Sequence, residues 1–336
     1  MKTVRWGLIS TANINRRLIP PIRASKRGTL AAVASRDLAK ARDYAREWGI
    51  KQAFGSYEEM LESDAVDAVY ISLPNHLHAE WSIKALRAGK HVLCEKPFAI
   101  SLEEVDAMIA AQQETGLALM EAFMYRHHPQ NKMIGEWVRE GKVGDVTLIR
   151  GSFSFYMGDQ PGNVRLNPDW GGGALWDVGV YPLSYAQFIY GELPESVSGQ
   201  QHIGKSGVDE TFAGLLRYSG GRSAIISCGF ETPHQTSIEI HGTGGRIALT
   251  RPFTGMNERG REITYTAPDG KAEKLHTPGP DPYLCEVENM QDAVLDGKPT
   301  YVTLAESRNH IRTALALYES ARTGREVRLE SVGSNT

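Results

Sequence analysis

The stretch VRWGLISTANI, residues 4–14, decides the fold of the first part of the chain. Its apolar beginning predicts a buried strand, and the small and polar residues after Ile9 predict a tight turn into a helix. Gly7 and Ala12 match a Gly-x-Gly-x-x-Gly/Ala fingerprint, whereas Ser10 replaces a glycine. Such a turn lets backbone N–H groups approach a pyrophosphate, although a plain strand-to-helix turn explains these residues alone equally well. The candidate contacts with a dinucleotide are Gly7, Ser10, Thr11, Ala12, Asn13 and Ile14.

The same strand-then-helix pattern repeats down the first third of the chain. Apolar runs at 29–34, 66–73, 91–94 and 117–123 alternate with helical stretches at 38–48, 76–88 and 101–115. Gly49 fits a helix C-cap, and Ser101 with Glu104 fits a capping box. Alternating units of this length predict a doubly wound parallel sheet with right-handed crossovers.

The pattern changes after Tyr125. A helix near 127–140 leads into strand-rich sequence, in which Gly220-Gly221, Gly244-Gly245 and Asp269-Gly270 are turn signals. Two closing helices, about 284–295 and 304–322, are expected to cover one face of the resulting sheet. We therefore predict an α/β protein with a Rossmann domain over residues 1–125 and an α+β domain with a large open mixed or antiparallel sheet over residues 126–336.

Composition and charge narrow the class of protein. The 336 residues carry a formal net charge of -3, without a basic block, which argues against a nucleic-acid partner. No apolar run approaches the length of a membrane span. Three cysteines, far apart and without paired spacing, fit neither a disulfide framework nor a zinc site, so we expect no metal and a reducing cytoplasm.

The end of the second predicted strand bears on the choice of dinucleotide. An NAD enzyme usually has an acidic residue there to accept from the ribose 2′-hydroxyl, but this chain has Ser35 and Arg36. A hydroxyl and a guanidinium suit a 2′-phosphate, and Lys40 could add to them. NADP(H) is therefore the expected cofactor. In the alternative interpretation, Arg36 is a solvated loop residue and Asp37 accepts from the ribose.

Further motifs, at matching spacing, make the chain resemble the glucose-fructose oxidoreductase, inositol dehydrogenase and rhizopine-catabolism family. They are Ser72-Leu73-Pro74-Asn75-His76-Leu77-His78, Cys94-Glu95-Lys96-Pro97, Met120-Glu121-Ala122-Phe123-Met124-Tyr125-Arg126 and the run from Gly171-Gly172-Gly173 to Tyr181-Pro182. Tyr181 stands where inositol-dehydrogenase-like members have histidine. The chain is therefore more similar to the aldose 1-dehydrogenases, dihydrodiol dehydrogenases and sugar ketoreductases.

The resemblance implies an active-site lysine at Lys96, with Tyr181 as its partner at the reacting oxygen. Hydride transfer leaves a proton to be moved, and an ammonium beside a phenol favours the phenolate, which can take or return it. Asp177 is four residues before Tyr181, so a helix would put both on one face, where Asp177 could orient the substrate or Lys96. Alternatively, Tyr181 is a core tyrosine and Asp177 caps the helix that follows Gly173.

The remaining expected contacts follow from the resemblance or border these motifs. Cofactor contacts are expected from Ser72, Leu73, Pro74, Asn75, His78, Glu95, Lys96, Glu121 and Arg165, and substrate contacts from Lys96, Tyr156, Arg165, Asp177, Tyr181 and Tyr283. Arg165 could contact either molecule. An i,i+2 histidine pair, His76 and His78, does not suggest a metal site.

These expectations define one leading function and two alternatives. The leading one is an NADP(H)-dependent oxidoreductase of a sugar or a similar polyhydroxylated small molecule. The alternatives are an NAD-dependent glycoside hydrolase of the same fold and a non-catalytic NADP(H) sensor. Strands such as 213–218 and 223–230 carry apolar residues on both faces, which predicts a homodimer or homotetramer built through the second-domain sheet.

Overall fold

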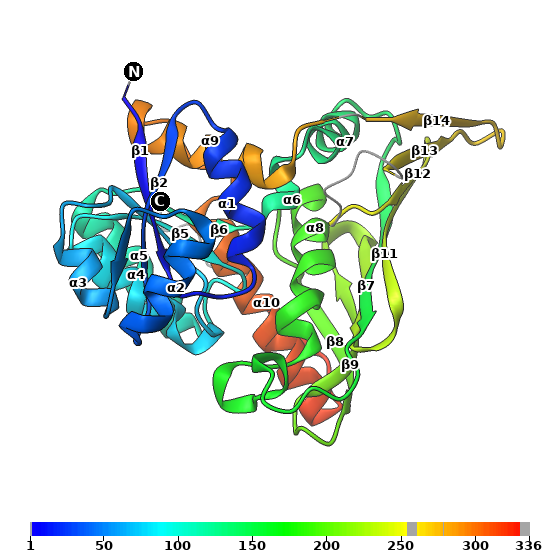
Figure 1. Cartoon of the computed structure of the whole chain (residues 1–336). Coiled ribbons are helices and arrows are strands. Elements are labelled where there is room, and N and C mark those ends of the chain that lie inside the picture. Colours follow the sequence, from blue (N-terminus) through cyan, green and yellow to red (C-terminus); the bar gives the residue numbers. More distant parts are fainter. Residues whose placement is uncertain (1, 254–260, 278, 330–336) are drawn as a thin grey trace. The chain divides into compact units, whose positions relative to one another are not determined.

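A computed structural model describes residues 2–253, 261–277 and 279–329, and its contacts divide the chain into two units (Figure 1). The first unit contains the chain up to His127 together with Pro280–Arg308. The second contains His128–Gly279 and the chain from Asn309 onward. The predicted boundary near Tyr125 thus lies close to the first crossing. However, Pro280–Arg308, assigned from the sequence to the second domain, packs with the first unit.

The first unit is built on a parallel sheet with the strand order β3-β2-β1-β4-β5-β6. The strands are β1 (Val4–Ile9), β2 (Gly28–Ala34), β3 (Gln52–Phe54), β4 (Ala68–Ile71), β5 (His91–Glu95) and β6 (Leu119–Ala122). This confirms the predicted doubly wound sheet. The order reverses between β1 and β4, and ligands of open α/β sheets bind outside the carboxyl ends of the strands at such a point.

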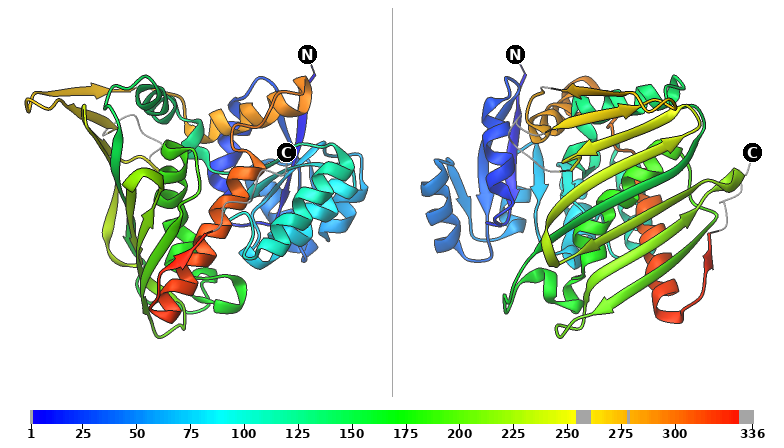
Figure 2. Two further views of the ribbon diagram at one scale, coloured as in Figure 1. Left: turned by 180° about the vertical axis from the view of Figure 1, so that it is seen from behind. Right: turned by 90° about the vertical axis from the view of Figure 1, so that its right-hand side faces the viewer.

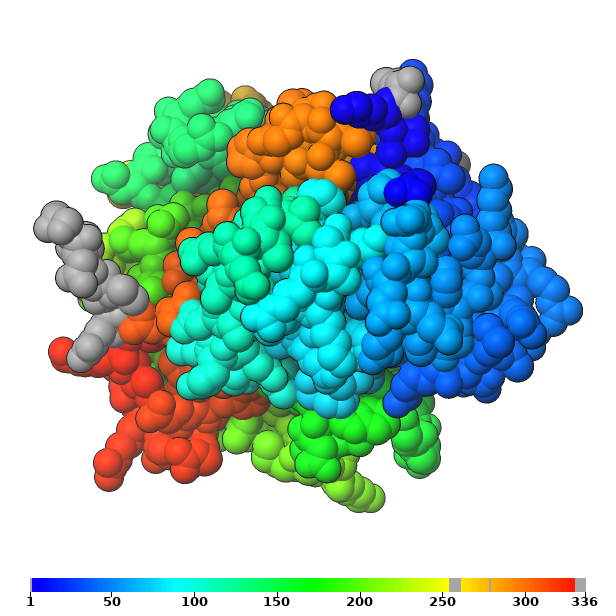
Figure 3. Space-filling model, turned by 90° about the vertical axis from the view of Figure 1, so that its left-hand side faces the viewer, coloured from blue at the N-terminus to red at the C-terminus, as the bar shows by residue number. Residues whose placement is uncertain are grey.

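Helices connect these strands. They are α1 (Asn15–Ala24), α2 (Leu38–Trp48), α3 (Tyr57–Glu62), the 3₁₀ turn η1 (Asn75–Leu77), α4 (His78–Arg87), α5 (Leu102–Thr115) and α6 (Met124–His127). Both predicted caps are present, since Gly49 has a φ of 57° and Ser101 accepts from the Glu104 N–H at 3.2 Å. Helices α4 and α5 pack side by side and form part of the surface in Figure 3. The sequence did not predict β3 and α3, which are short.

Helix α9 (Pro282–Asp296) corrects one expectation, because it packs on α1, α6 and β1 of the first unit and not on the second sheet. Gln291 accepts a hydrogen bond from the Ser25 hydroxyl at 2.6 Å. Arg27 forms ion pairs with Asp292 at 2.7 Å and Asp296 at 2.8 Å. The amphipathic pattern predicted a buried face but could not identify the surface that buries it.

The second unit is built on a mixed sheet with the order β14-β13-β12-β11-β7-β10-β9-β8-β15. Its strands are β7 (Val146–Tyr156), β8 (Ser196–Ile203), β9 (Asp209–Arg217), β10 (Ser223–Gly229), β11 (Glu231–Gly242), β12 (Gly245–Thr250), β13 (Glu262–Thr266), β14 (Ala272–His276) and β15 (Val327–Arg328). Neighbours are antiparallel except β7 and β10, which confirms the predicted open mixed sheet. Gly242 pairs with Gly245, so the glycine-rich stretch there is the predicted hairpin turn.

Helices cover one face of this sheet. Besides α7 (Pro129–Arg139), the unit contains α8 (Val180–Tyr190) and most of α10 (Leu304–Thr323). Helix α8 packs on β7 and β10, and α10 is tied to β8 by a bond from the Gly199 N–H to the Ser320 hydroxyl at 2.9 Å. The right-hand view of Figure 2 shows the face of the sheet that the helices do not cover, with α10 behind the strands. The covering helices are therefore α8 and α10, where the sequence suggested α9 and α10.

Candidate active site

The turn after β1 has the backbone geometry that a dinucleotide turn requires. Ser10 has a φ of 108°, in the region that favours glycine, so this serine adopts a conformation expected of the glycine that it replaces. Its hydroxyl accepts from the Ala12 N–H at 3.1 Å and lies 2.9 Å from the Ser72 hydroxyl. Gly7 lies inside β1, where a Cβ would come within 2.9 Å of Val66, so its absence of a side chain serves close packing.

The same turn is joined to the end of β4. The Asn15 amide donates to the Ser10 carbonyl at 2.9 Å, and its side-chain oxygen accepts from the Ser72 hydroxyl at 2.7 Å. Asn15 is fully buried. These bonds hold the loops after β1 and β4 together at the point where the strand order reverses. Thr11, Ala12, Asn13 and Ile14 lie in this turn, between β1 and α1.

The N-terminus of α1 is suited to an anion. Its N-cap residue, Ile14, makes no side-chain cap, and its first turn contains no acidic residue. Arg16 and Arg17 follow directly in that turn. The N–H groups of Asn15, Arg16 and Arg17 donate to the carbonyls of the preceding turn. The partial positive charge of the helix end and the two arginines are therefore what suit this end to a pyrophosphate.

The loop after β2 shows how Asp37 is used. Its carboxylate caps α2, accepting from the N–H groups of Ala39 at 2.9 Å and Lys40 at 3.2 Å, while the Ser35 hydroxyl accepts from the Asp37 N–H at 3.3 Å. Arg36 is exposed. Burial raises the pKa of the Tyr57 hydroxyl, and the neighbouring Arg36 guanidinium opposes this rise. The side chain of Arg36 is therefore directed toward α3.

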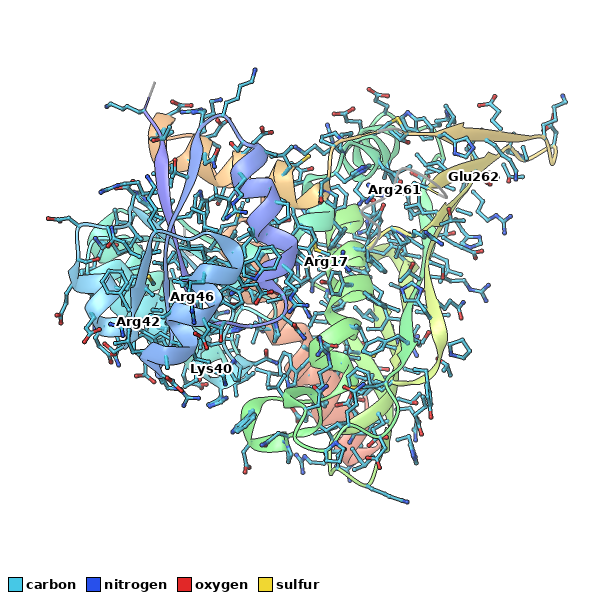
Figure 4. The ribbon with its side chains drawn as sticks, in the orientation of Figure 1. Arg17, Lys40, Arg42, Arg46, Arg261 and Glu262 are labelled. Atoms are coloured by element: carbon cyan, nitrogen blue, oxygen red, sulfur yellow. The ribbon has the colours of Figure 1, made fainter. Side chains whose placement is uncertain are left out.

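Lys40, Arg42 and Arg46 all project from α2, as Figure 4 shows. Of the three, only Lys40 lies in the first turn of α2, which Asp37 caps. Arg46 is paired with Asp43, within the same helix. Lys40 is therefore the best placed of these cations to join Arg36 at the end of β2.

The loops after β4 and β5 are tied together by His78. This histidine is fully buried, and its Nδ1 and Nε2 lie 2.8 Å from the Pro97 carbonyl oxygen and 2.9 Å from the Leu73 carbonyl oxygen. Burial lowers its pKa to about 4, although the two carbonyls oppose this. A neutral ring carries one N–H, so it donates to one of these two carbonyls and packs against the other. Any effect of His78 on a cofactor would pass through the loops, where Pro74 and Asn75 are half-buried.

Lys96 lies at the carboxyl end of β5 in a segment fixed by acidic side chains. Its N–H donates to the Glu95 carboxylate at 3.2 Å, and the buried hydroxyl of Tyr70 donates to the same carboxylate. Glu121, on β6 and almost completely buried, accepts from the Phe98 N–H at 3.0 Å. The Lys96-Pro97 peptide bond is cis. Glu95 and Glu121 thus fix the backbone on both sides of Lys96.

Tyr283 lies on α9 in the same unit as Lys96. Burial, with the carboxyl groups of Glu95 and Glu286, raises the pKa of its hydroxyl above the ordinary value. Glu286 is fully buried, and its carboxyl oxygens have no hydrogen-bond partner among the described residues. Burial, followed by the charge of Glu95, raises the pKa of Glu286 well above its ordinary value, which favours the neutral form of this carboxyl.

In the second unit the structure brings Arg165 and Asp177 together. The Arg165 Nε lies 2.6 Å from Asp177 Oδ2, and the aspartate side chain is only 13% exposed. Arg165 belongs to the 3₁₀ turn η2 (Val164–Leu166), and Asp177 to a π-helical segment, η4 (Leu175–Gly179). Asp177 is not the cap of this segment, because Asp209 from β9 accepts from the Leu175 N–H at 2.7 Å. The proposed capping role of Asp177 is therefore wrong.

Tyr181 is the second residue of α8, which directly follows the π-helical segment. It is 6% exposed, and its ring packs on Phe153 and Phe253 with centroid distances of 5.2 and 5.5 Å. A π-helical turn is rare and is frequently found at functional sites. Tyr156, the last residue of β7, is 71% exposed.

Three buried polar residues were missed in the sequence. Asn15 and Asp209 hold the two turns described above, and Glu286 lies beside Glu95. Asn15 carries a signal, since it is the polar residue at the start of the first predicted helix. Asp209 and Glu286 meet their partners only through the fold. Among the described residues, no group of three or more His, Cys, Asp or Glu could hold a metal ion. None of the helices in the described ranges is long and apolar enough to cross a membrane.

These two units match a family of oxidoreductases. Residues 4–123 match the family described as "Oxidoreductase family, NAD-binding Rossmann fold", and residues 132–248 match its "GFO/IDH/MocA C-terminal domain". The chain therefore belongs to the GFO/IDH/MocA oxidoreductase family, which confirms the resemblance drawn from the sequence.

Individual relatives cover nearly the whole chain. D-xylose 1-dehydrogenase (NADP(+)) 2 of Haloferax volcanii is 38% identical over 97% of this chain and 99% of its own. KijD10, a 3-ketoreductase from Actinomadura kijaniata in complex with NADP and TDP-benzene, is 34% identical with a TM-score of 0.86, over 96% of this chain and 98% of its own. The aldose-aldose oxidoreductase from Caulobacter crescentus, complexed with glycerol, is 26% identical with a TM-score of 0.90, over 98% and 100%.

Proposed function

We propose that the protein is an NADP(H)-dependent oxidoreductase that transfers a hydride between nicotinamide and a carbinol or carbonyl carbon of a sugar or a similar polyhydroxylated cyclic substrate. The observation that carries this proposal is the arrangement at the carboxyl ends of three neighbouring strands. The turn after β1 is joined to the loop after β4, and the Glu95-Lys96 segment follows β5 in the next position. The relatives named above, a sugar dehydrogenase and a ketoreductase with NADP, support it.

The choice of NADP(H) rests on the loop after β2. Asp37, the residue that could bind a ribose 2′-hydroxyl, is engaged with the backbone of α2. Ser35, Arg36 and Lys40 remain to bind a 2′-phosphate through a hydroxyl and cationic groups, which suit phosphate. The loop therefore fits NADP(H) better than NAD(H).

We assign the following roles to the chain's own residues. The bound cofactor supplies or accepts the hydride, which leaves a proton to be exchanged with the substrate oxygen. Tyr181 is our candidate for that exchange, as the base in oxidation and the acid in reduction. Lys96 is our candidate for holding the substrate oxygen. Asp177, fixed by its ion pair with Arg165, orients a substrate hydroxyl.

Four further contacts complete the assignment. Because Arg165 is paired with Asp177, we propose that it contacts the substrate and not the cofactor. Tyr156 is exposed and can contact the substrate through its ring. Tyr283 lies beside Glu95, and Glu121 supports the loop after Lys96. We propose that Tyr283 and Glu121 act mainly by positioning Lys96.

The two alternatives are disfavoured by specific features. A hydrolase that uses NAD transiently has no need of a 2′-phosphate site, which the loop after β2 suggests. A non-catalytic sensor has no need of Lys96, in a segment whose backbone N–H groups are bound by the Glu95 and Glu121 carboxylates. Release of free sugar without net change in nicotinamide absorbance would favour the hydrolase.

We also propose a homodimer or homotetramer through the uncovered face of the second sheet. Leu215, Ile225 and Arg150 are cross-strand neighbours on that face, and Glu239 continues the row. Ile225 is 42% exposed. The row is thus apolar on β9 and β10 and charged on β7 and β11. Such a mixture is more typical of a specific protein–protein interface than of non-specific aggregation. The described cysteines are free, which fits the proposed cytoplasmic location.

The test is a substrate panel of aldoses, keto-deoxysugars and aromatic dihydrodiols, assayed with NADP⁺ or NADPH by nicotinamide absorbance. Turnover of a polyhydroxylated cyclic substrate is the expected result. Tight NADPH binding without turnover of any member of the panel would contradict the enzymatic proposal and favour the sensor.

A further inference from the structure

The segment that carries Asp177 and Tyr181 begins with three successive glycines, and each of the last two is required by a close approach. Gly172 lies over the loop before it, where a Cβ would come within 2.6 Å of the Arg165 carbonyl oxygen. Gly173 has a φ of +127°, and a Cβ there would lie 2.0 Å from Asp209 Oδ1. The chain thus passes directly between the Arg165 loop and the Asp209 carboxylate.

Asp209 is the first residue of β9 and is 2% exposed. Its Oδ2 accepts from the Leu175 N–H at 2.7 Å, and its Oδ1 accepts from the Tyr318 hydroxyl of α10 at 2.8 Å. The π-helical segment has no side-chain cap of its own. Asp209 therefore supplies the cap from a distant strand and connects the segment to α10.

The rest of the segment depends on this attachment. The Asp177 N–H donates to the Gly173 carbonyl at 3.0 Å, and the Gly173 N–H donates to the Arg165 carbonyl at 3.0 Å. Below the segment, a Cβ on Gly179 would lie 2.7 Å from the Cys228 sulfur. Asp209 thus holds the first residues of the π-helical segment, and the position of Asp177 follows from them.

We infer that Asp209 is a positioning residue, which fixes the first turn of residues 175–179 and thereby the directions of Asp177 and Tyr181. This inference rests on the proposed function, because it concerns residues that act on the substrate there. Burial raises the pKa of Asp209 to about 6, while the hydrogen bonds from Leu175 and Tyr318 oppose the rise. Ionising this carboxyl therefore costs stability in the folded chain.

The test compares four variants with the unmodified protein. Asp209→Ala removes both attachments, Tyr318→Phe removes one, and Asp209→Asn keeps an acceptor for the Leu175 N–H. Ile247→Ala, in the fully buried core of β12, is a matched control for lost stability. Each variant is measured for kcat and KM, for NADPH affinity, and for hydrogen exchange of the amides of residues 175–181.

We expect Asp209→Ala to lower kcat about 100-fold, the scale for a small displacement of reacting groups, and Tyr318→Phe to lower it about tenfold. NADPH affinity should stay within about threefold, since the cofactor residues lie in the first unit. Asp209→Asn should restore kcat to within about tenfold of the unmodified value. The amides of 175–181 should exchange faster in Asp209→Ala than in Ile247→Ala.

A kcat of Asp209→Ala equal to that of Ile247→Ala, with equal exchange at 175–181, overturns the inference. If Asp209→Ala does not fold, Tyr318→Phe decides in the same way. If the unmodified protein turns over no substrate, the proposed function fails. Hydrogen exchange then tests Asp209 alone, and unaltered exchange at 175–181 overturns its positioning role.

Discussion

Replacing Arg36 by alanine should remove most of the preference for NADPH over NADH. In the loop after β2, the Asp37 carboxylate caps α2, and Ser35 accepts from the Asp37 N–H. Arg36 is exposed and lies beside the Tyr57 hydroxyl. It is therefore a principal group in this loop with which a 2′-phosphate can form a charge-assisted hydrogen bond.

The expected size follows from the exposure of Arg36. A hydrogen bond to a charged group contributes about 1.5–3 kcal/mol, and solvent brings an exposed pair to the lower end of this range. About 1.4 kcal/mol corresponds to a tenfold difference in affinity. We therefore expect the unmodified protein to bind NADPH at least about tenfold more tightly than NADH, and Arg36→Ala to bind the two nearly equally. The preference should also decrease at high salt.

Titration of both cofactors by intrinsic fluorescence measures the preference. Asp37→Asn is the matched control, because asparagine is also a good N-cap. If Asp37 binds the ribose instead, this control should weaken NADH binding, whereas our interpretation predicts little change. Equal affinities for NADPH and NADH in the unmodified protein would refute the reasoning.

Three other predictions concern the chemical step, assembly and stability. Lys96→Ala and Tyr181→Phe should each lower kcat by about 10²- to 10⁴-fold with NADPH affinity within a few-fold; near-normal turnover of Tyr181→Phe would leave proton transfer to Lys96. Light scattering at micromolar concentration should show a dimer or tetramer that Ile225→Arg dissociates, and an active monomer would contradict the interface. Asp209 has a pKa of about 6 against an ordinary 3.8, so its ionised form destabilises the folded state. Asp209→Asn should therefore become more stable than the unmodified protein as the pH rises from about 4 to 6. The difference in the free energy of unfolding should reach about 3 kcal/mol. A thermal unfolding difference that does not depend on pH would contradict this assignment.

Most of the first unit could be predicted because its signals are local. The bounds of α2 and the caps at Gly49 and Ser101 follow from residues close in sequence to the elements that they end or begin. Even the departure at Ser10 is accommodated locally, by a positive φ and a bond to the Ala12 N–H. The strand β3 was missed because three residues at a sheet edge carry too little pattern.

The candidate site was predicted as a set of residues but not as a set of contacts. Arg165 and Asp177 were both identified, yet their ion pair depends on the backbone path through Gly172 and Gly173. His78 was expected near the cofactor, and the structure buries its ring between the loops after β4 and β5, where it faces the Leu73 and Pro97 carbonyls. A motif gives the residue types and their spacing, whereas the partner of each side chain is set by the fold.

Apart from the short elements β3 and α3, the features that the sequence did not predict have one physical origin, since each joins residues far apart in the chain. The strand-rich pattern before α9 suggested that this helix covers the second sheet, but Gln291 and Asp292 find Ser25 and Arg27 in the first unit. Asp209 likewise looks like an ordinary polar residue at the start of a strand. Its carboxylate becomes a cap only because the fold brings the start of β9 to the glycine turn before Leu175. The bond from the Leu175 N–H to Asp209 joins residues 34 positions apart in the chain. Local pattern therefore predicts which elements form, and the long-range contacts that orient Asp177 and Tyr181 have to be read from the structure.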